Sequence, residues 1–547
     1  MDSKNIQVLI LSAGKIEKDL EKIIGDIPSG LISLNGKPVI FRIIDKLVSE
    51  GFTKISITIG YKKEIIQKII SEHYRGIEFK FIYSEFAKPP GNSIKTAINY
   101  CSDEKVLILL SSTLYENNLL DLINKNNNFV LSSKKFKSPK NWCVITQKNQ
   151  KINKIFDKDN NLVKNENHYV LIGCYFFNDV KLLKSILETF NEEDRIEISY
   201  ILDKYKQKND ILVEFSEQWH DVGHLENYFS TKQFLLKARH FNSLYFNKDE
   251  KTITKKSENK IKLIDEINWY KNIPKDFFKL LPKLINSDIS NDPFLKLEYI
   301  KYPTLSEIWL YDNFSTIFWL KIIDELFEII HKFNNFKKDV SIQDYHFMYF
   351  DKTVQRIDDL TTSNILFKKI FDEPTILINN IKFQNWSILK HKIKSKINDL
   401  YNVKDNCIIH GDLYFSNILY DSKNNDFKII DPRGKWSKGN SGDIKYDIAK
   451  IRHSVVGGFD IITNGLYSIS YEEKNGILFE AYKPKNHELI CKKLDSLIEK
   501  SWNIEDIKMI EGLLFISMIP LHKDNFERQL AFYSIGIQRL NEVFYKT

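Results

Sequence analysis

Short apolar runs alternate with longer amphipathic stretches over the first 235 residues. The runs have the length and composition of strands and lie at 6–11, 55–59, 79–83, 105–110 and 129–132. The stretches at 39–50 and 63–72 repeat apolar residues with helical spacing. This alternation predicts a mostly parallel sheet with helices on both faces. Two later runs, at 170–177 and 219–223, are predicted to be further strands of the same unit.

The pattern changes near residue 240. A hairpin is predicted at 244–255, with a polar turn at 247–250, and a helix at 261–270. A strand-like run at 294–300 and a long amphipathic helix at 315–333 follow. Beyond its motif strands, roughly the last 150 residues are predicted to be largely helical. The second half therefore reads as a small lobe built on a sheet, followed by a helical large lobe.

Composition argues against a nucleic-acid-binding, membrane-spanning or secreted protein. The net charge is +8, from 80 basic and 72 acidic residues spread along the chain, which is not the concentrated footprint of a nucleic-acid binder. No apolar run reaches the ~20 residues needed to cross a bilayer, and charged Asp2 and Lys4 argue against a signal peptide. The five cysteines include no CxxC pair and fit reduced thiols. We expect a cytoplasmic protein with no nucleic-acid partner and no membrane insertion; composition leaves the oligomeric state open.

The strongest chemical signal is a pair of apolar runs that each end in carboxylates. The first run leads into His410-Gly411-Asp412, Asn417 follows five positions after Asp412, and the second run ends at Asp431. Phosphoryl transfer needs a carboxylate that orients the acceptor hydroxyl and oxygen ligands that hold Mg²⁺ on the phosphates. Asp412 is therefore predicted to be the catalytic base, and Asn417 and Asp431 the metal ligands.

This His-Gly-Asp set resembles the aminoglycoside phosphotransferase and choline kinase superfamily, which phosphorylates small molecules. The resemblance implies a bilobal, protein-kinase-like α+β domain at 240–547, with its small lobe at 240–305 and its helical lobe at 306–547. It also implies ATP and Mg²⁺ as cofactors and a small-molecule acceptor as the partner.

The resemblance further implies a phosphate-contacting lysine at a strand end and a glutamate on the next helix. Lys255 and Lys256 both end the predicted strand, and only one of them can face the cleft. Because Ile253 is the apolar, inward candidate, Lys255 is favoured, and Glu266 is its expected ion-pair partner. A surface lysine and a surface glutamate are the plain structural alternative.

Glu298, Tyr299 and Ile300 resemble the hinge between the two lobes, whose backbone groups would meet the adenine edge; a simple core strand is equally compatible. Asp447 matches a position that usually braces the catalytic loop, and His410 is predicted to be structural. Arg433 lies close to Asp431 and either grips an anionic acceptor or pairs with a structural acid.

The N-terminal motifs resemble those of sugar-phosphate and choline-phosphate nucleotidyltransferases. They are Leu9-Ile10-Leu11-Ser12-Ala13-Gly14, then Asn35-Gly36-Lys37-Pro38, and finally Trp219-His220-Asp221-Val222-Gly223. The resemblance implies a Rossmann-like domain at 1–235, joined to the second domain near 236–243. It also implies that the amides of Ala13 and Gly14 contact the phosphates of CTP or another NTP, and that Asp221 is a metal ligand.

Several residues depart from that family pattern. Lys18 stands where the family has an arginine, Ser29 replaces the lysine of Pro-Lys, and Ser111-Ser112 replace Gly-Asp. Without these charges the phosphates would repel each other, because charge neutralisation and positioning supply nearly all of the catalysis. An impaired N-terminal domain is therefore expected.

Three functions compete. The leading hypothesis is an ATP- and Mg²⁺-dependent kinase that phosphorylates a hydroxyl of a sugar, polyol or amino alcohol for capsule precursor synthesis. The alternative is a bifunctional kinase–nucleotidyltransferase that releases a nucleotide-activated product. The third is a scaffold in which both domains bind ligands without turnover.

Overall fold

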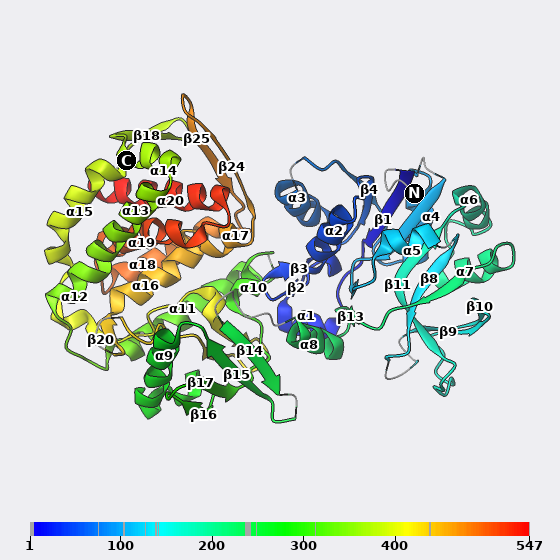
Figure 1. Cartoon of the computed structure of the whole chain (residues 1–547), viewed down its shortest axis with the longest axis horizontal. Coiled ribbons are helices and arrows are strands. Elements are labelled where there is room, and N and C mark those ends of the chain that lie inside the picture. The colour runs from blue at the N-terminus through cyan, green and yellow to red at the C-terminus, as the bar shows by residue number, and fades with distance from the viewer. Residues whose placement is uncertain are drawn as a thin grey trace. The chain divides into compact units, whose positions relative to one another are not determined.

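The computed structural model divides the chain into two compact units, residues 1–235 and 236–547 (Figure 1). It describes residues 5–545 except 75, 102–103, 126, 137–138, 140–141, 236–241, 248, 312 and 437–438. Most of the predicted junction at 236–243, and Lys248 in the predicted turn, therefore lie outside the described residues. No helix in the described part of the chain is long and apolar enough to cross a membrane.

The N-terminal unit is built on a nine-stranded sheet in the order β5-β4-β1-β6-β11-β8-β12-β10-β9. Its strands are β1 (Ile6–Ser12), β4 (Ile55–Ile59), β5 (Phe79–Tyr83), β6 (Lys105–Leu110), β8 (Phe129–Ser133), β9 (Cys143–Lys148), β10 (Lys151–Asp157), β11 (Tyr169–Phe177) and β12 (Leu212–Phe215). Short strands β7 (Thr113–Tyr115) and β13 (Trp219–Asp221) form a separate ribbon, as do β2 (Ser33–Leu34) and β3 (Lys37–Pro38).

This sheet is mixed, and it is not mostly parallel as the strand–helix alternation predicted. Strands β5, β4, β1 and β6 run parallel, and so do β8 and β12. Strand β11 lies antiparallel between β6 and β8 and also pairs with β9, and β10 runs antiparallel to both β9 and β12. The chain enters β11 from the β9–β10 hairpin without a crossover helix, and a parallel pairing would need such a crossover.

Every residue of β1 is buried, so other elements must cover both faces of the sheet at this strand. Leu9 and Leu11 share one apolar cluster with α4 (Pro90–Ile98), α6 (Val180–Glu188) and α7 (Ile198–Lys206). Alternating Val8 and Ile10 are excluded from that cluster and point to the opposite face. The remaining helices are α1 (Lys18–Ile24), η2 (Ser29–Leu31), α2 (Val39–Ser49), α3 (Lys63–His73), α5 (Leu119–Lys125) and α8 (Leu225–Phe234).

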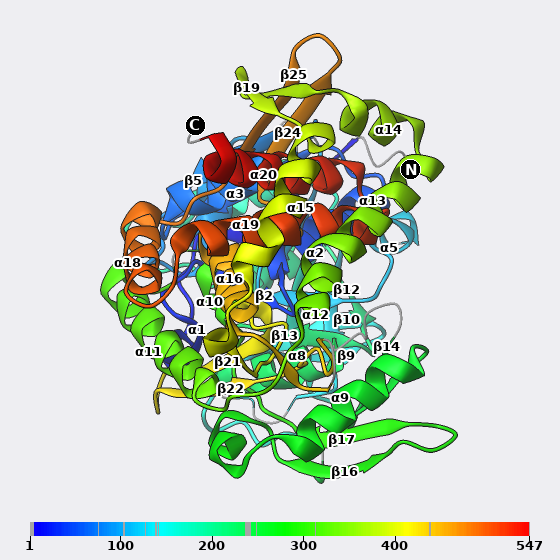
Figure 2. The same cartoon turned by 90° about the vertical axis from the view of Figure 1, so that its left-hand side faces the viewer.

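The C-terminal unit opens with a small antiparallel sheet, in the order β14-β15-β17-β16 (Figure 2). Its strands are β14 (Asn242–Asn247), β15 (Thr252–Ser257), β16 (Leu284–Asp288) and β17 (Phe294–Glu298). Helix α9 (Lys260–Asn272) packs on β15 and β17, and the short η4 (Lys275–Leu280) follows it. This is the predicted order of a sheet lobe before a helical lobe.

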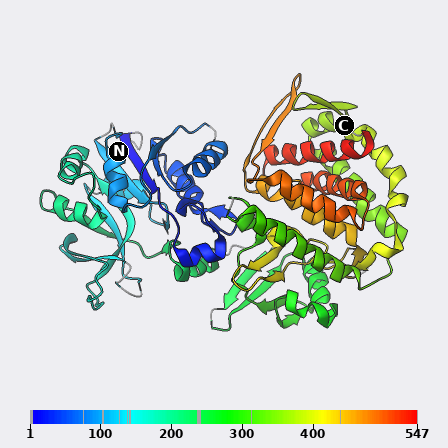
Figure 3. The same cartoon turned by 180° about the vertical axis from the view of Figure 1, so that it is seen from behind.

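The large lobe is mainly helical, with a cluster of α16, α18, α19 and α20 visible from behind in Figure 3. Its helices are α10 (Leu305–Trp309), α11 (Thr316–Asn334), α12 (Ile342–His346), α13 (Lys352–Ser363), α14 (Ile365–Asp372), α15 (Trp386–Leu400), α16 (Ile444–Val455), α17 (Phe459–Thr463), α18 (His487–Glu499), α19 (Ile504–Met518) and α20 (Phe526–Tyr545). A π-helical turn, η5 (Phe347–Asp351), joins α12 to α13.

One sheet in this lobe was not expected. Strands β18 (Thr375–Ile378), β19 (Ile381–Gln384), β24 (Tyr467–Glu472) and β25 (Gly476–Ala481) pair in the order β19-β18-β25-β24. The prediction that this terminal region is largely helical is therefore wrong for 467–481. The Asn475-Gly476 step was a turn signal, since Gly476 has a φ of +77° and fits the hairpin between β24 and β25.

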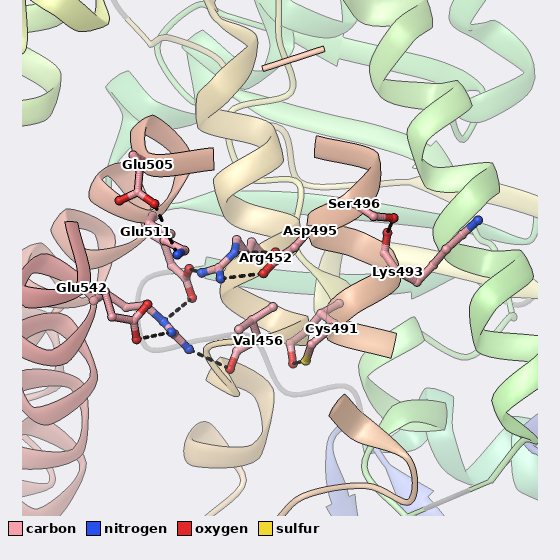
Figure 4. A network of polar contacts seen from close by, with 12 residues as sticks. Arg452, Val456, Cys491, Lys493, Asp495, Ser496, Glu505, Glu511 and Glu542 are labelled. Carbon is pink, nitrogen blue, oxygen red and sulfur yellow. Dashed lines mark hydrogen bonds and ion pairs between the residues drawn. The ribbon is translucent and has the colours of Figure 1, made fainter. Parts of the chain in front are cut away.

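A buried ionic network ties four of the helices together (Figure 4). Arg452 on α16 donates to Asp495 of α18 at 2.9 and 3.1 Å and is ion-paired with Glu511 of α19. Arg452 is 2% exposed and Glu511 is fully buried. Arg539 of α20 lies 3.6 Å from the second Glu511 oxygen and donates to Glu542 at 2.7 Å.

Replacing Arg452 with Met is expected to lower the free energy of unfolding by about 3–5 kcal/mol, because Glu511 would keep a buried charge without its partner. Urea denaturation of the full chain measures the loss. Lys508→Met is the matched control, since it breaks a partly exposed pair with Glu505 and should cost about 0–1 kcal/mol. Equal losses in the two variants would contradict the role assigned to Arg452.

Candidate functional site

The loop that carries Asp412 lies between two short strand pairs. Strands β20 (Asn406–Ile408) and β23 (Ser441–Asp443) pair before it, and β21 (Ile418–Asp421) and β22 (Asp426–Ile429) pair after it. Ile418 pairs with Ile429 across the β21–β22 hairpin, so the end of the loop lies beside the residues that follow β22. The Ile430 amide donates to the Asn417 carbonyl at 3.0 Å. The hairpin thus brings Asn417 and Asp431 to the same place.

Asp447 on α16 holds the loop backbone. Its two carboxylate oxygens accept hydrogen bonds from the amides of His410 at 2.7 Å and Gly411 at 2.8 Å. Asp447 is fully buried, and burial raises its pKa to about 7, although the two amides favour the ionised form. Gly411 has a φ of +80°, a conformation that glycine adopts without strain.

Asp412 follows this clamp and contacts a cation. Its Oδ1 lies 3.1 Å from Nζ of Lys450, which stands on the same helix as Asp447. Burial would raise the pKa of Asp412, but Lys450 and Arg433 outweigh it and hold the pKa below its usual range. Asp412 is therefore ionised at neutral pH and can accept a hydrogen bond from a hydroxyl.

Two oxygen ligands suited to Mg²⁺ lie next to Asp412. Asn417 is 5% exposed, and its Nδ2 donates to the Asp412 carbonyl at 3.0 Å, so its Oδ1 is directed elsewhere. Asp431 is half-exposed and has a φ of +54°, a left-handed conformation that is uncommon outside glycine. One amide oxygen and one carboxylate, completed by substrate phosphates, fit the usual Mg²⁺ site of phosphoryl-transfer enzymes.

Lys255 joins the small lobe to this loop. Its Nζ lies 2.7 Å from Glu266 Oε2 on α9 and 3.0 Å from Asp431 Oδ1. Burial would lower the pKa of Lys255, but Asp431 and Glu266 raise it, so the ammonium stays charged. Lys256 points away and pairs with exposed Asp292. The structure therefore brings Lys255, and not Lys256, to the predicted metal ligands.

The predicted hinge continues from β17. The amides of Glu298 and Tyr299 donate to Lys283 and Lys251 carbonyls, each at 2.9 Å. These two amides are therefore engaged within the small lobe, which leaves Ile300 and the hinge carbonyls to meet an adenine. The Tyr420 amide donates to the Pro303 carbonyl at 2.9 Å and fixes the hinge beside β21.

His410 is 1% exposed, and its ring lies edge-on to Trp269 with centroids 5.8 Å apart. Its Nδ1 accepts a hydrogen bond from the Asp412 amide at 3.3 Å. Burial lowers the pKa of His410 to about 4, so the ring is neutral near pH 7. This neutral acceptor matches the structural role predicted from the sequence.

The motif residues of the N-terminal unit also meet, but with few charges. The Ser29 amide donates to the Gly14 carbonyl at 3.1 Å, and the Ser29 and Ser111 hydroxyls lie 3.4 Å apart. The Ala13 carbonyl accepts from the Tyr61 amide at 2.9 Å. Ser29, at the family's lysine position, therefore contacts Ser111, which replaces the glycine of Gly-Asp and directly precedes Ser112 at the aspartate position.

Asp221 is engaged by its own segment. It is 5% exposed and accepts hydrogen bonds from Asn227 Nδ2 at 3.0 Å and the Gly223 amide at 3.1 Å, and it lies 2.7 Å from His224 Nδ1. The hydrogen bond to Asp221 raises the pKa of His224. Across the described ranges, no three His, Cys, Asp or Glu side chains gather as a metal site, and this includes the surroundings of Asp221.

A cavity of about 670 Å³ opens beside Asp221. Trp142 and Trp219 meet edge-on at 5.2 Å on its wall, and its charged lining mixes Lys135 and Lys164 with Glu17, Asp19 and Asp221. Aromatic faces beside charged groups of both signs suit a polar ligand such as a sugar. Sequence reasoning missed Trp142, because it opens the apolar run 142–145 and resembles a core residue there.

Comparisons with known proteins bear on this N-terminal unit. A family model described as nucleotidyl transferase matches residues 8–238. The UTP–glucose-1-phosphate uridylyltransferase AglF of Haloferax volcanii is 29% identical over 120 residues, which is 22% of this chain and 49% of that protein. The D-glycero-alpha-D-manno-heptose 1-phosphate guanylyltransferase of Campylobacter jejuni is 24% identical over 229 residues, which is 41% of this chain and 97% of that protein.

Among solved structures, a putative glucose-1-phosphate thymidylyltransferase from Bacillus anthracis matches with a TM-score of 0.38 and 17% identity, covering 43% of this chain and 96% of that one. HddC from Yersinia pseudotuberculosis matches with a TM-score of 0.34 and 19% identity, covering 42% and 98%. The family match confirms that the N-terminal unit is related to sugar-phosphate nucleotidyltransferases. These matches do not test the kinase-like assignment of the C-terminal unit.

Acid is expected to destabilise the protein through His410. An unfolded histidine has a pKa of about 6.5, so the unfolded chain binds more protons than the folded chain between about pH 6.5 and 4. The contribution of His410 to the free energy of unfolding should fall by about 3 kcal/mol as the pH decreases through that window, while Asp447, whose pKa burial raises to about 7, contributes in the opposite direction.

Denaturation at several pH values tests this expectation, because the difference in free energy of unfolding between wild type and His410→Asn should change by that amount across the window, whereas the difference for exposed His391→Asn should stay constant. A slope that stays the same in His410→Asn would contradict it.

Proposed function

We propose that the C-terminal unit is an ATP- and Mg²⁺-dependent phosphotransferase that phosphorylates a hydroxyl of a small molecule. The observation that carries the proposal is the position of Lys255 between Glu266 and Asp431, at 2.7 and 3.0 Å. It unites a phosphate-binding cation from the small lobe with a predicted metal ligand from the large lobe. Asp412 and Asn417 lie in the adjacent loop, and they complete the set that phosphoryl transfer requires.

Each residue has a distinct task in this reaction. Lys255 holds ATP phosphates, Asn417 Oδ1 and the Asp431 carboxylate would hold Mg²⁺, and the metal neutralises the charge of the phosphates. The acceptor oxygen forms a bond to the γ-phosphorus while the bond from that phosphorus to the bridging oxygen breaks. ADP leaves with that electron pair, and the hydroxyl proton passes to Asp412 and then to water.

Asp412 acts mainly by orientation. A carboxylate whose pKa is held below its usual range is a weak base towards an alcohol in the ground state. It therefore fixes the hydroxyl in line with the γ-phosphorus and takes the proton late, when the new bond is largely formed. Lys450, 3.1 Å away, is a positioning residue for this carboxylate.

The N-terminal unit carries a second candidate function, nucleotidyl transfer to a sugar phosphate. The match over residues 8–238 supports a bifunctional protein better than it supports the kinase with an impaired partner that the sequence favoured. Under this proposal the kinase would make a phosphomonoester for nucleotide activation, as capsule precursor synthesis requires. The observation against it is that Ser29 and Ser112 stand at the family's charged positions, so the phosphate-neutralising charges are absent there.

Asp412→Asn is expected to lower kcat by about 10²–10⁴-fold, since the amide cannot take the hydroxyl proton. Lys255→Met should lower kcat/KM for ATP at least about tenfold, because an ion pair to the phosphates is lost. Phosphorus NMR with ATP, Mg²⁺ and a panel of sugars, polyols and amino alcohols, with and without phosphate groups, measures both.

Lys256→Met is the matched control, since the neighbouring lysine points away from the site. The kinase proposal is wrong if Lys256→Met and Lys255→Met lose the same activity, or if Asp412→Asn keeps full activity.

If the N-terminal unit is active, the wild-type chain should release pyrophosphate from CTP, UTP, GTP or dTTP with a sugar 1-phosphate. Asp221→Asn should lower that rate, and Asp412→Asn should leave it unchanged. A double variant, Ser29→Lys with Ser112→Asp, restores the two missing charges. Release by this double variant alone would show that the natural unit is impaired and would contradict the bifunctional proposal.

A further inference from the structure

Four cationic side chains surround the catalytic carboxylate of the C-terminal unit. Lys352 and Arg356 stand four residues apart on α13 and therefore share one face of that helix. Lys450 stands on α16, and Arg433 follows Asp431 by two residues. Tyr349, three residues before Lys352, donates to Asp443 at 2.8 Å, and its ring centroid lies 6.2 Å from that of Tyr446, so the start of α13 lies beside the start of α16. Electrostatic coupling also links all four cations to one another or to Asp412, so they form one cluster.

Three of these cations have no acidic partner in the described part of the chain. Lys450 is paired with Asp412 at 3.1 Å, but the structure gives no ion pair within 4.0 Å to Lys352, Arg356 or Arg433. Arg356 instead donates to the Ser517 carbonyl at 3.0 Å. Asp447, the other nearby carboxylate, has both oxygens taken by loop amides. The cluster therefore carries more positive than negative charge.

The positive charges of these side chains destabilise the folded protein when no ligand is bound. Burial lowers the pKa of Lys352, and repulsion by Arg433, Arg356 and Lys450 lowers it further, with only Asp412 opposing. Half-buried charges of one sign are costly unless a counter-charge meets them. The arrangement therefore favours a ligand that brings negative charge.

The cluster also lies where an acceptor must lie. The Arg433 amide donates to the His410 carbonyl at 2.9 Å. The Arg433 side chain packs so closely on the loop that a Cβ on Gly411 would stand 2.7 Å from Arg433 Cβ. The π-helical turn at Phe347–Asp351 immediately precedes Lys352, and such turns often mark functional sites. Lys352, Arg356 and Arg433 thus gather beside Asp412, whereas Lys255 lies at Asp431.

We propose that the acceptor is an anionic alcohol, a sugar or polyol that carries a phosphate group bound by Lys352, Arg356 and Arg433 while its hydroxyl meets Asp412. The inference rests on the proposed phosphotransferase function and names its substrate class. A phosphate is favoured over a carboxylate because three unpaired cations match a dianion, and two guanidinium groups can each hold it through two hydrogen bonds. A cationic amino alcohol would be repelled.

The proposal fixes the product. The acceptor hydroxyl oxygen bonds to the γ-phosphorus of ATP, ADP leaves with the bridging oxygen's electron pair, and the proton goes to Asp412 and then to water. The anionic group takes no part in bond making, so the product carries two phosphate groups. The cations of the cluster act by binding and orientation.

Calorimetric titration of the full chain with inorganic phosphate tests the anion site without knowledge of the acceptor. Wild type is expected to bind phosphate, and Arg356→Gln and Lys352→Gln should each weaken that binding at least about tenfold, which is the loss of ~1.4 kcal/mol. Lys368→Gln removes an exposed charge from neighbouring α14 and should bind as wild type does. Lys255→Met should retain this binding, because Lys255 belongs to the ATP site.

Phosphate binding that is absent, or that survives both α13 variants, would overturn the proposal. Loss of phosphate binding in Lys255→Met with no effect of Arg356→Gln would overturn it too, since the anion would then occupy the ATP site.

Turnover separates this inference from the proposed function. With ATP and Mg²⁺, matched acceptors are compared: glycerol, glycerate and glycerol 3-phosphate, and glucose, glucuronate and glucose 6-phosphate. The phosphorylated member of a pair should be preferred over its neutral partner by ~100-fold or more in kcat/KM, and Arg356→Gln should raise its KM with little change in the KM for ATP.

Preference for a neutral, cationic or carboxylate acceptor would overturn the inference and leave the kinase standing. Phosphate binding at Arg356 without phosphoryl transfer to any alcohol would instead sink the kinase and retain the anion site.

Discussion

The two hydrogen bonds from the His410 and Gly411 amides to Asp447 are the interaction on which the C-terminal site depends. They use both oxygens of one fully buried carboxylate, so the loop backbone has one position relative to α16. Lys450, one turn further along the same helix, then fixes the Asp412 side chain. One helix therefore sets both the backbone and the carboxylate of the catalytic loop. The Arg452 network anchors that helix to α18 and α19, and so the ionic core and the site form a continuous structure.

The sequence could predict the parts of this site that are local. Asp412, Asn417 and Asp431 are linked by two short strands, so their spacing along the chain sets their positions in space. Strand alternation similarly distinguished Lys255 from Lys256. Lys352, Arg356 and Lys450 could not be found this way, because α13 and α16 reach Asp412 only through tertiary packing. The antiparallel pairings of β11 were missed for a related reason, since no property of that run indicates which neighbour it pairs with or in which direction.

Different kinds of evidence support the functions proposed for the two units. Residues 8–238 match a nucleotidyltransferase family, yet Ser29 and Ser112 stand where that family places a lysine and an aspartate, and Ser111, next to Ser112, contacts Ser29. Because both charges are absent, neither position holds a buried charge without a partner. Loss of the two charges therefore carries no electrostatic penalty for the fold. The function proposed for the C-terminal unit rests instead on the positions of Asp412, Asn417, Asp431 and Lys255, and not on a relative.

Repulsion among the cations on the proposed acceptor side of the site destabilises the folded protein, and packing alone does not explain why these charges are present. Lys352, Arg356 and Arg433 repel one another, and each could be replaced by a neutral residue without loss of an ion pair within the described ranges. A fold selected for stability alone would shed such charges, whereas a binding site keeps them when a ligand returns the energy on binding. The same repulsion disfavours the scaffold hypothesis, since excess charge beside an ionised Asp412 serves the positioning of a reacting anion better than it serves packing.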